Sequence, residues 1–514
     1  AQPSDDPDFD TRFKQQCQQD YITIKSIYNK IIPKVVTMDE LKEAIKAINT
    51  GKSEDIYGLS IENIIYAGEE FLHHLLDLIN NIIAQDSIPE LVKVGLLSPI
   101  YKNKGEKNDS KNYRGIVVLP IICKLLEHIA RTNFRTILTE KQSPLQRGFT
   151  TNISPLNAAI IIEEVYREYS EKKAPFYIAL LDAKSAFDVV DIDILMRKLH
   201  LLDIQPSTWK IIDNLHHDTR TCIKWKQQVS DSFDCQQGVK QGGLLSAELY
   251  KLYIEDLLKS YENSKIGCRI GTITINAVAC ADDIALVSDN PHDLQILVNQ
   301  AVQYSITHRY KLQPQKSVVI EVNKKGRNQQ DKNLPLKINQ DDMPTVEKSA
   351  HLGILRSKSN QKTENSQIEQ NITKARRTAY SLLSTGFYGK NGLDPITSIS
   401  LYKTYVQPVL MYGLEIVQPK QTNLKKLEVF QKNILKQILS LPTNAPDPAI
   451  YIISGLLPIE AILDIKYMTL FNNICRQHDD AIEKQLVTRQ LNIKTNESKS
   501  WFTILKKTLI KYDL

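Results

Sequence analysis

The sequence predicts an α+β protein, because regions of the 514-residue chain differ in hydrophobic period. Apolar residues recur at helical spacing up to about residue 169, and short continuous apolar runs typical of buried strands follow between 175 and 288. Helical spacing returns beyond residue 360. The hydrophobic fraction of 42% and the charged fraction of 24% suit a globular protein and exclude a collagen-like or disordered chain. No apolar run approaches the roughly 18 residues of a membrane helix, so we expect no membrane partner.

The N-terminal part of the chain is predicted to be mainly helical. Residues 1–36 form a polar extension that includes one helix, and Thr37 with Glu40 then makes a capping-box pattern. Apolar spacing predicts further helices from residue 38, over 71–83, over 120–138 and over 154–169. Residues 91–102 read as a strand, followed by a charged, glycine-containing loop up to residue 112.

The middle of the chain is predicted to hold the main sheet. The run 175–181 reads as a buried strand that ends at Asp182. Two strand-like runs, 273–279 and 284–288, flank a turn with Asp282 and Asp283, which predicts a hairpin with its acids at the turn. Helices are expected over 192–201, 243–259 and 292–308, a polar loop over 324–348, and later helices most clearly over 399–406 and 424–439.

The cysteines and the charge distribution indicate the redox environment of the protein and the kind of partner it binds. The seven cysteines are odd in number, widely spaced and without a CxxC pair, which predicts a reduced, intracellular protein with no zinc knuckle in this span. The net charge is only +6, but residues 356–441 hold 13 Lys and Arg against five Asp and Glu. This local excess favours a polyanionic partner such as nucleic acid, with an ordinary solvated basic face as the alternative.

Three carboxylates carry the predicted chemistry. Asp182 closes a buried strand, and Asp282 with Asp283 lies at the turn of an apolar hairpin. Carboxylates at the edge of an apolar sheet repel each other and are tolerable when a cation compensates them. Hard oxygen ligands favour Mg²⁺, and two such ions about 3.5–4 Å apart would activate a 3′-hydroxyl and stabilise a leaving pyrophosphate. The alternative interpretation is that Asp-Asp marks a solvated turn.

Several motifs occur around these acids in a fixed order. They are KNYRGI at 111–116, QRGF at 146–149, DAKSAFD at 182–188, GVKQGG at 238–243, ADD at 281–283, YKLQPQK at 310–316 and HLGI at 351–354. With these motifs the sequence resembles the reverse transcriptases of non-LTR (LINE-type) retrotransposons, over about residues 38–475. The resemblance implies a right-hand polymerase fold with helical fingers, a mixed α/β palm and a helical thumb.

The resemblance also implies a division of the chain into five segments. These are an N-terminal extension (1–36), fingers with N-terminal helices (37–175), a palm carrying the catalytic site (176–355), a basic helical thumb (356–441) and a C-terminal helical connector (442–514).

The family's metal and nucleotide sites map onto particular residues. Asp182, Asp282 and Asp283 match the triad that binds two Mg²⁺ ions, with Mn²⁺ able to substitute, and the backbone carbonyl of Ala183 would complete the coordination. Phe187 matches an aromatic steric gate that excludes the 2′-hydroxyl of ribonucleotides. The alternative for Phe187 is a core phenylalanine at a strand-to-helix turn.

Further contacts to substrate and nucleic acid follow from the same resemblance. Arg114 and Lys102 match cations on the incoming triphosphate, or are ordinary surface charges. Gln241 and Gly242 match a turn under the nascent base pair, where a missing side chain allows close approach. Lys316 matches a general acid that protonates pyrophosphate, or is a solvated lysine. Template–primer contacts along the thumb are expected from Lys374, Arg376, Arg377, Lys425 and Lys432.

The sequence departs from the family pattern at a few positions. Cys280 stands where most members have Tyr or Phe, and Gly115 follows Arg114 where a proline is frequent. The triad itself is intact, which favours an active enzyme. The tryptophans are interpreted as core residues rather than stacking platforms: Trp209, Trp225 and Trp501.

The predicted function is therefore RNA-directed DNA polymerase activity, extending a DNA primer with dNTPs on an RNA template. Two kinds of alternative remain: a group II intron maturase-like or host-domesticated reverse transcriptase, and a catalytically dead RNA-binding scaffold. We expect no endonuclease within this span, so that the chain is a fragment or depends on a nuclease from elsewhere. The expected location is intracellular, in the nucleus, the cytoplasm or both.

Overall fold

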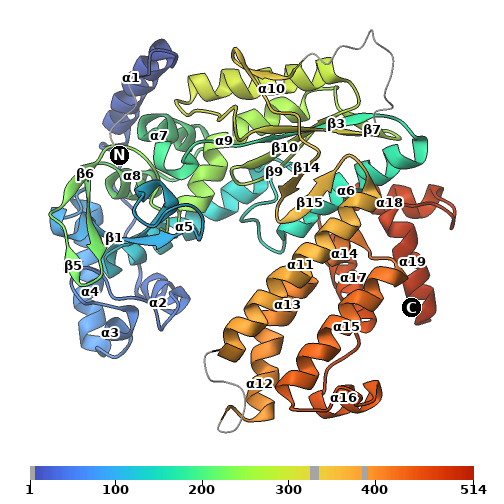
Figure 1. Cartoon of the computed structure of the whole chain (residues 1–514). Coiled ribbons are helices and arrows are strands. Elements are labelled where there is room, and N and C mark those ends of the chain that lie inside the picture. Colours follow the sequence, from blue (N-terminus) through green and yellow to red (C-terminus); the bar gives the residue numbers. More distant parts are fainter. Residues whose placement is uncertain (1–5, 324–334, 385–391, 514) are drawn as a thin grey trace. The chain divides into compact units, whose positions relative to one another are not determined.

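The computed structural model describes residues 6–323, 335–384 and 392–513 (Figure 1). By its internal contacts the chain divides into two compact units, each built from several segments. Unit 1 comprises Ala1–Phe149, Ala183–Asn263 and Asn299–Gln313. Unit 2 comprises Thr150–Asp182, Ser264–Val298 and Pro314–Leu514.

Unit 1 is built mainly from helices whose ends follow local sequence signals. α2 begins at the predicted capping box, in which the Glu40 amide donates to Thr37 Oγ1 (3.2 Å) and the Thr37 amide donates to Glu40 Oε2 (2.9 Å). α1 packs on α7, where Lys14 bridges Asp191 (2.7 Å) and Asp193 (2.6 Å). The helices are α1 (Thr11–Tyr28), α2 (Met38–Ala47), α3 (Ile61–Ile65), α4 (Glu69–Ala84), α5 (Ile121–Lys141), α7 (Ile192–Leu201), α8 (Pro206–His216) and α9 (Ser246–Glu262), with 3-10 turns at Glu90–Lys93, Ser110–Asn112 and Ala186–Val189.

A five-stranded sheet completes unit 1. Its strands are β1 (Val94–Tyr101), β2 (Tyr113–Val118), β4 (Thr219–Trp225), β5 (Gln228–Val229) and β6 (Phe233–Cys235). The order is β2-β1-β4-β5, and β6 also pairs with β4. β1 runs antiparallel to β2 and parallel to β4.

Unit 2 holds the predicted main sheet, which has four antiparallel strands. The order is β11 (Val318–Val322), β3 (Phe176–Leu181), β10 (Asp283–Ser288) and β9 (Ala277–Cys280). Every residue of β3 is buried, as expected for an inner strand without charged side chains. Three small hairpins accompany it: β7 (Cys268–Ile270) with β8 (Ile273–Ile275), β12 (Lys337–Ile338) with β13 (Asp341–Asp342), and β14 (Lys348–His351) with β15 (Ile354–Ser357).

The central helix of unit 2 is α6 (Pro155–Lys172), which contacts both the sheet hairpins and the C-terminal helices (Figure 1). It carries buried acids. Glu163 pairs with Arg167 (2.8 Å) and with Arg356, and the second Arg356 nitrogen donates to the Ala159 carbonyl (2.9 Å). Burial opposes ionisation of Glu163, but the two guanidinium groups hold its pKa below the ordinary value.

The remaining elements of unit 2 are helical. One helix, α10 (Pro291–Thr307), is shared, because the chain passes from unit 2 to unit 1 within it. α11 and α15 pack together, and Tyr402–Val406 forms a π-helical turn before α13. The helices are α11 (Asn360–Leu382), α12 (Pro395–Leu401), α13 (Gln407–Met411), α14 (Leu414–Val417), α15 (Gln421–Ile438), α16 (Asp447–Ser454), α17 (Ile459–Cys475), α18 (Ile482–Ile493) and α19 (Trp501–Lys511).

Most of the predicted elements are confirmed, with two differences. The predicted run 273–279 is two strands, because the chain leaves its pairing with β7 and joins β10 at Asn276. Trp209 and Trp501 are fully buried, but the core prediction for Trp225 is wrong, since 48% of that side chain is exposed. Part of the predicted polar loop, residues 324–334, lies outside the described residues, and the described part differs from the prediction in containing the β12–β13 hairpin. The five functional segments stay a prediction.

No single helix in the described ranges is long and apolar enough to span a bilayer, although α16 and α17 together, bent by 53°, meet that length and composition.

Candidate active site

The first acid of the predicted triad lies at the end of the inner strand of unit 2. β3 stops at Leu181, and the amide of Asp182 donates to the Ser317 hydroxyl (3.0 Å) at the start of β11. This bond fixes the backbone of Asp182 against the neighbouring strand. The local sequence explains the position, because six apolar residues form the buried strand and the first polar residue follows it.

The second and third acids lie in the hairpin between β9 and β10. Cys280 pairs with Asp283, so that Ala281 and Asp282 form the two-residue turn, and Ala281 has a φ of +57°. In the β10–β3 register Ile284 faces Leu181. One step further along the same antiparallel register, Asp283 lies across from Asp182. The structure therefore brings the three predicted acids to one end of the sheet.

The electrostatics of this sheet end show that the acids affect one another. Partial burial raises the pKa of Asp282, and the neighbouring Asp182 raises it further. The pKa of Asp283 is raised by partial burial and then by Asp282 and Asp182. Among the residues that the structure describes, no three His, Cys, Asp or Glu side chains converge tightly enough to hold an ion. Shared ligation by the triad therefore requires these side chains to turn toward one another.

Lys316 lies close to the triad in the fold. It is exposed in the turn before β11, whose first residue Val318 faces Leu180 of β3. The hydroxyl of its neighbour Ser317 accepts from the Asp182 amide, so the backbone of Lys316 lies next to that of Asp182. Its assignment as a general acid stays a prediction.

Phe187 is held in the 3-10 turn Ala186–Val189 of unit 1. Its ring is partly buried and stacks on Tyr250 (centroids 4.7 Å apart, 16° between planes), and its carbonyl accepts from the Val239 amide (2.8 Å). Ala183, at the start of this segment, forms a β-bridge with Leu312. These contacts give the ring a fixed position, while the gate role itself stays a prediction.

The turn with Gln241 and Gly242 packs against β2 in unit 1. The Gln241 carbonyl accepts from the Val117 amide (2.7 Å), and its side chain donates to Asp188 (3.3 Å). Gly242 has a φ of +117°, and a Cβ there would lie 2.6 Å from the Val117 carbonyl oxygen. Glycine is therefore required by the approach of two protein backbones, a physical reason independent of any substrate.

A residue that the sequence reasoning missed supports the same turn. Glu127 of α5 is buried and accepts the Leu244 amide (3.0 Å), and its carboxylate lies where a side chain on Gly243 would be. Burial raises the pKa of Glu127 to about 7 despite this bond and the nearby Lys240. A lone glutamate in an amphipathic helix carries no signal in the sequence, because its partner amide comes from a distant segment.

The two predicted triphosphate cations lie on the β1–β2 region of unit 1. Arg114 is exposed on β2 opposite Ile100, and Lys102 is exposed just after β1 with its ammonium bonded to the Lys111 carbonyl (2.8 Å). Both cations are thus accessible on one hairpin, and their substrate roles stay predictions.

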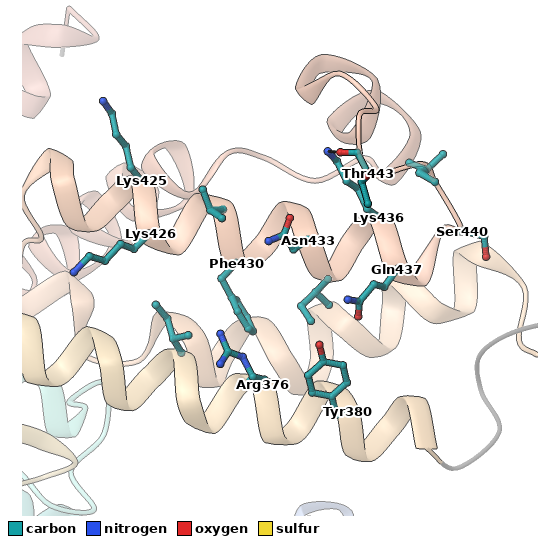
Figure 2. Close-up of a pocket in the computed structure, with 14 residues that line it drawn as sticks. Arg376, Tyr380, Lys425, Lys426, Phe430, Asn433, Lys436, Gln437, Ser440 and Thr443 are labelled. Atoms are coloured by element: carbon teal, nitrogen blue, oxygen red, sulfur yellow. Dashed lines mark hydrogen bonds between the residues drawn. The ribbon is translucent and has the colours of Figure 1, made fainter.

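The basic helices α11 and α15 enclose an open groove of about 1090 Å³ (Figure 2). Figure 2 shows Arg376 and Tyr380 projecting from α11 toward α15, with Phe430 between the helices. The Arg376 guanidinium lies 6.0 Å from the Phe430 ring centroid. Lys425 and residues that the sequence reasoning did not select line the same groove: Lys426, Lys436 and Tyr380.

The other predicted thumb cations lie differently. Lys374 and Arg377 are exposed on α11 but do not line the groove. The ammonium of Lys432 is bonded to Asp447 (2.6 Å), which partly neutralises it. Contact of these residues with nucleic acid stays a prediction.

Comparison with known proteins bears on this arrangement. Residues 102–354 match the family described as reverse transcriptase (RNA-dependent DNA polymerase). These residues form a reverse transcriptase domain. The domain includes the three acids, the Phe187 turn and the Gln241–Gly242 turn, and the match confirms the predicted right-hand polymerase fold.

Named relatives place the domain among retrotransposon enzymes. The chain is 24% identical over 354 residues to the Pol polyprotein of the type-1 retrotransposable element R2 of Popillia japonica (68% of this chain, 48% of that protein). It is 22% identical over 420 residues to the RNA-directed DNA polymerase of the mobile element jockey of Drosophila funebris (79% and 44%). The chain spans less than half the length of these relatives. The predicted resemblance to non-LTR reverse transcriptases is confirmed.

Solved structures with some likeness include two telomerases. One is telomerase from Candida albicans in complex with a telomeric RNA fragment (TM-score 0.41, 11% identity, 85% of this chain and 68% of that one). The other is apo telomerase from Candida tropicalis lacking its C-terminal domain (TM-score 0.36, 13% identity, 52% and 54%).

Proposed function

We propose that this chain catalyses RNA-templated DNA synthesis as the polymerase of a non-LTR retrotransposon. The observation that carries the proposal is the adjacency of Asp182 to the Asp282–Asp283 turn at one end of a buried sheet, within a reverse transcriptase domain. In the reaction, the primer 3′-hydroxyl attacks the α-phosphate of a dNTP, a phosphodiester bond forms and pyrophosphate leaves.

The three acids have the donor chemistry for divalent cations. Their hard oxygens suit Mg²⁺, which keeps waters and takes phosphate oxygens as further ligands. The raised pKa of Asp282 and Asp283 reflects burial and repulsion that a cation would offset. We propose that Asp182, Asp282 and Asp283 hold two Mg²⁺ ions, with Mn²⁺ able to substitute. Bound there, the ions would activate the primer hydroxyl and stabilise the charge on pyrophosphate.

The other predicted residues would act directly on the nucleotide. The Phe187 ring, fixed by its stack on Tyr250, would exclude a 2′-hydroxyl. Arg114 and Lys102 would bind the triphosphate, and Lys316 would donate a proton to pyrophosphate. The partners would be an RNA template and a DNA primer inside the cell, in the nucleus, the cytoplasm or both. The nicking endonuclease would act from outside this span.

Primer extension tests the proposal. The chain is incubated with a DNA primer on an RNA template, dNTPs and Mg²⁺, alongside Asp282→Asn and the matched control Asp341→Asn, an exposed acid directly after the two-residue turn of another hairpin. We expect extension by wild type and Asp341→Asn, and none above background by Asp282→Asn. If wild type binds the duplex tightly but extends no primer, the scaffold alternative is correct and the proposal fails.

A further inference from the structure

Three aromatic rings line up across the unit 1 sheet. Tyr101 ends β1, Tyr113 begins β2 opposite it, and Trp225 ends β4. The ring centroids of the two tyrosines are 5.4 Å apart, and those of Tyr113 and Trp225 are 5.6 Å apart with planes at 70°. The tyrosine hydroxyls donate to the Gly105 and Lys107 carbonyls of the connecting loop, which fixes the two rings.

These rings occupy one face of the sheet. Side chains alternate along a strand, so Tyr113 and its neighbour Arg114 point to opposite faces. Phe233 shares the face of Trp225, because it pairs with Thr221, four residues before Trp225 on β4. We call Tyr101, Tyr113, Trp225 and Phe233 the aromatic face. It is the face opposite to that of Arg114, one of the two predicted triphosphate cations.

The aromatic face is accessible. Trp225 is 48% exposed, Phe233 is 40% exposed and both tyrosines are partly exposed. Exposing a tryptophan ring to water is unfavourable, and rings of this size are usually buried. The exposure of Trp225 therefore indicates a binding partner.

Lysines surround this end of the sheet. The loop 102–112 contains four lysines and two acids, and the β4–β5 turn region 224–229 contains two lysines and no acid. All six lysines are exposed, Lys224 on the opposite face from Trp225, and the Lys107 ammonium lies 6.0 Å from the Tyr101 ring centroid. Aromatic rings bordered by cations suit a ligand that has flat bases and phosphates.

We propose that the aromatic face binds unpaired nucleotides of an RNA strand. Bases would stack on Trp225 and its neighbours, and phosphates would meet the lysines. Three rings spaced by 5–6 Å suit two or three bases, with little sequence preference because every base has a flat face. The inference rests on the proposed function in that the strand is taken to be the template, but binding itself requires no catalysis.

The chain offers a direct optical probe of this face. Trp209 and Trp501 are fully buried, so a quencher in solution reports mainly on Trp225. We expect a single-stranded uridine 12-mer RNA to quench the tryptophan fluorescence of wild type. The quench should be absent in Trp225→Phe, which removes the fluorophore but keeps a ring.

Binding affinity provides the decisive test. Anisotropy of the labelled RNA 12-mer, titrated between 50 and 200 mM salt, compares wild type with Trp225→Ala, Trp225→Phe and the matched control Val229→Ala. Val229 is 51% exposed on the same hairpin and pairs with Lys224, so it lies on the opposite face. We expect about tenfold weaker binding for Trp225→Ala, partial recovery for Trp225→Phe, no change for Val229→Ala, and a salt-dependent affinity. Melting curves confirm that each variant is folded.

The results that would contradict the inference can be told apart. If Trp225→Ala binds RNA as wild type does, the face serves another partner, such as a protein, and the inference is overturned. If only the matched DNA 12-mer loses affinity, the assignment to RNA is wrong. The same titration in the Asp282→Asn background separates the two proposals, because RNA binding needs no catalysis. Binding that depends on Trp225 in this background supports the aromatic face. If the wild type also extends no primer, only the proposed polymerase activity is refuted.

Discussion

Tyr412, in the segment predicted to be the thumb, contacts the turn between β14 and β15, and removing its hydroxyl tests how much this contact stabilises the turn. Leu352 and Gly353 both have positive φ (+52° and +77°), a conformation that a leucine adopts at a cost of about 1–2 kcal/mol. The Tyr412 hydroxyl donates to the Leu352 carbonyl (2.8 Å), and its ring lies against Gly353. The perturbation is Tyr412→Phe, which removes the bond and keeps the ring.

The magnitude follows from these contacts. The bond is exposed to solvent, so its net contribution is no more than about 1 kcal/mol, comparable with the strain at Leu352. Its loss should make local opening of the turn about fivefold more frequent. The backbone of Tyr412 stays fixed, because the buried Asn371 side chain donates to the Leu410 and Tyr412 carbonyls (both 2.9 Å). Global stability should therefore fall by no more than about 1 kcal/mol.

Hydrogen exchange and kinetics check this reasoning. Amides of residues 350–355 should exchange about fivefold faster in Tyr412→Phe. Burial raises the pKa of Tyr412, and Glu415 and Cys280 raise it further, so Tyr412 lies near the β9–β10 hairpin, where the catalytic acids are predicted. We therefore expect a higher KM for primer–template with nearly unchanged kcat. Tyr405→Phe, on an exposed tyrosine of the preceding helical segment, is the control. Unchanged exchange and unchanged KM in Tyr412→Phe would refute the reasoning.

Three further predictions concern the site. Without divalent ions, Asp282→Asn should raise the melting temperature at pH 7–8. The pKa of Asp282 is raised in the folded state, so the wild type loses stability as the pH rises through that pKa, and the variant does not. The difference in melting temperature should therefore vanish below about pH 3.9, the ordinary Asp value. An equal gain at pH 3 would contradict this. Gly242→Ala should lower the free energy of unfolding in urea by about 1–3 kcal/mol, since it combines positive φ with a backbone clash; an unchanged midpoint would show that the turn relaxes. Phe187→Ala should raise incorporation of UTP relative to dTTP by about tenfold or more in primer extension, and unchanged discrimination would refute the gate.

The parts of the fold that the sequence predicted are those with local signals. The capping box of Thr37 and Glu40, the apolar run before Asp182 and the hairpin around Asp282 all depend on neighbouring residues, and all three are confirmed. Bringing Asp182 beside the hairpin is not local, and it was predictable only through the family resemblance.

The parts that sequence reasoning missed depend on contacts between distant segments. Glu127 supports a turn more than a hundred residues away, and nothing near it in the chain indicates that role. Trp225 was assigned to the core because tryptophan is usually buried, but its strand ends at an uncovered part of the sheet. Lys432 looked like a free cation until the fold placed Asp447 beside it.

The buried acids of α6 have a consequence for how this chain can be divided. Glu164 accepts the Trp501 amide (3.0 Å) and the Gln490 side chain (2.7 Å), and Lys494 bridges Glu168 (2.8 Å) and Glu171 (2.7 Å). Part of the counter-charge for α6 therefore comes from Lys494, just after α18. Truncation at residue 441 would remove these partners and expose the face of α6 that they cover. Any division of the chain must accordingly keep α6 together with the helices that follow residue 441.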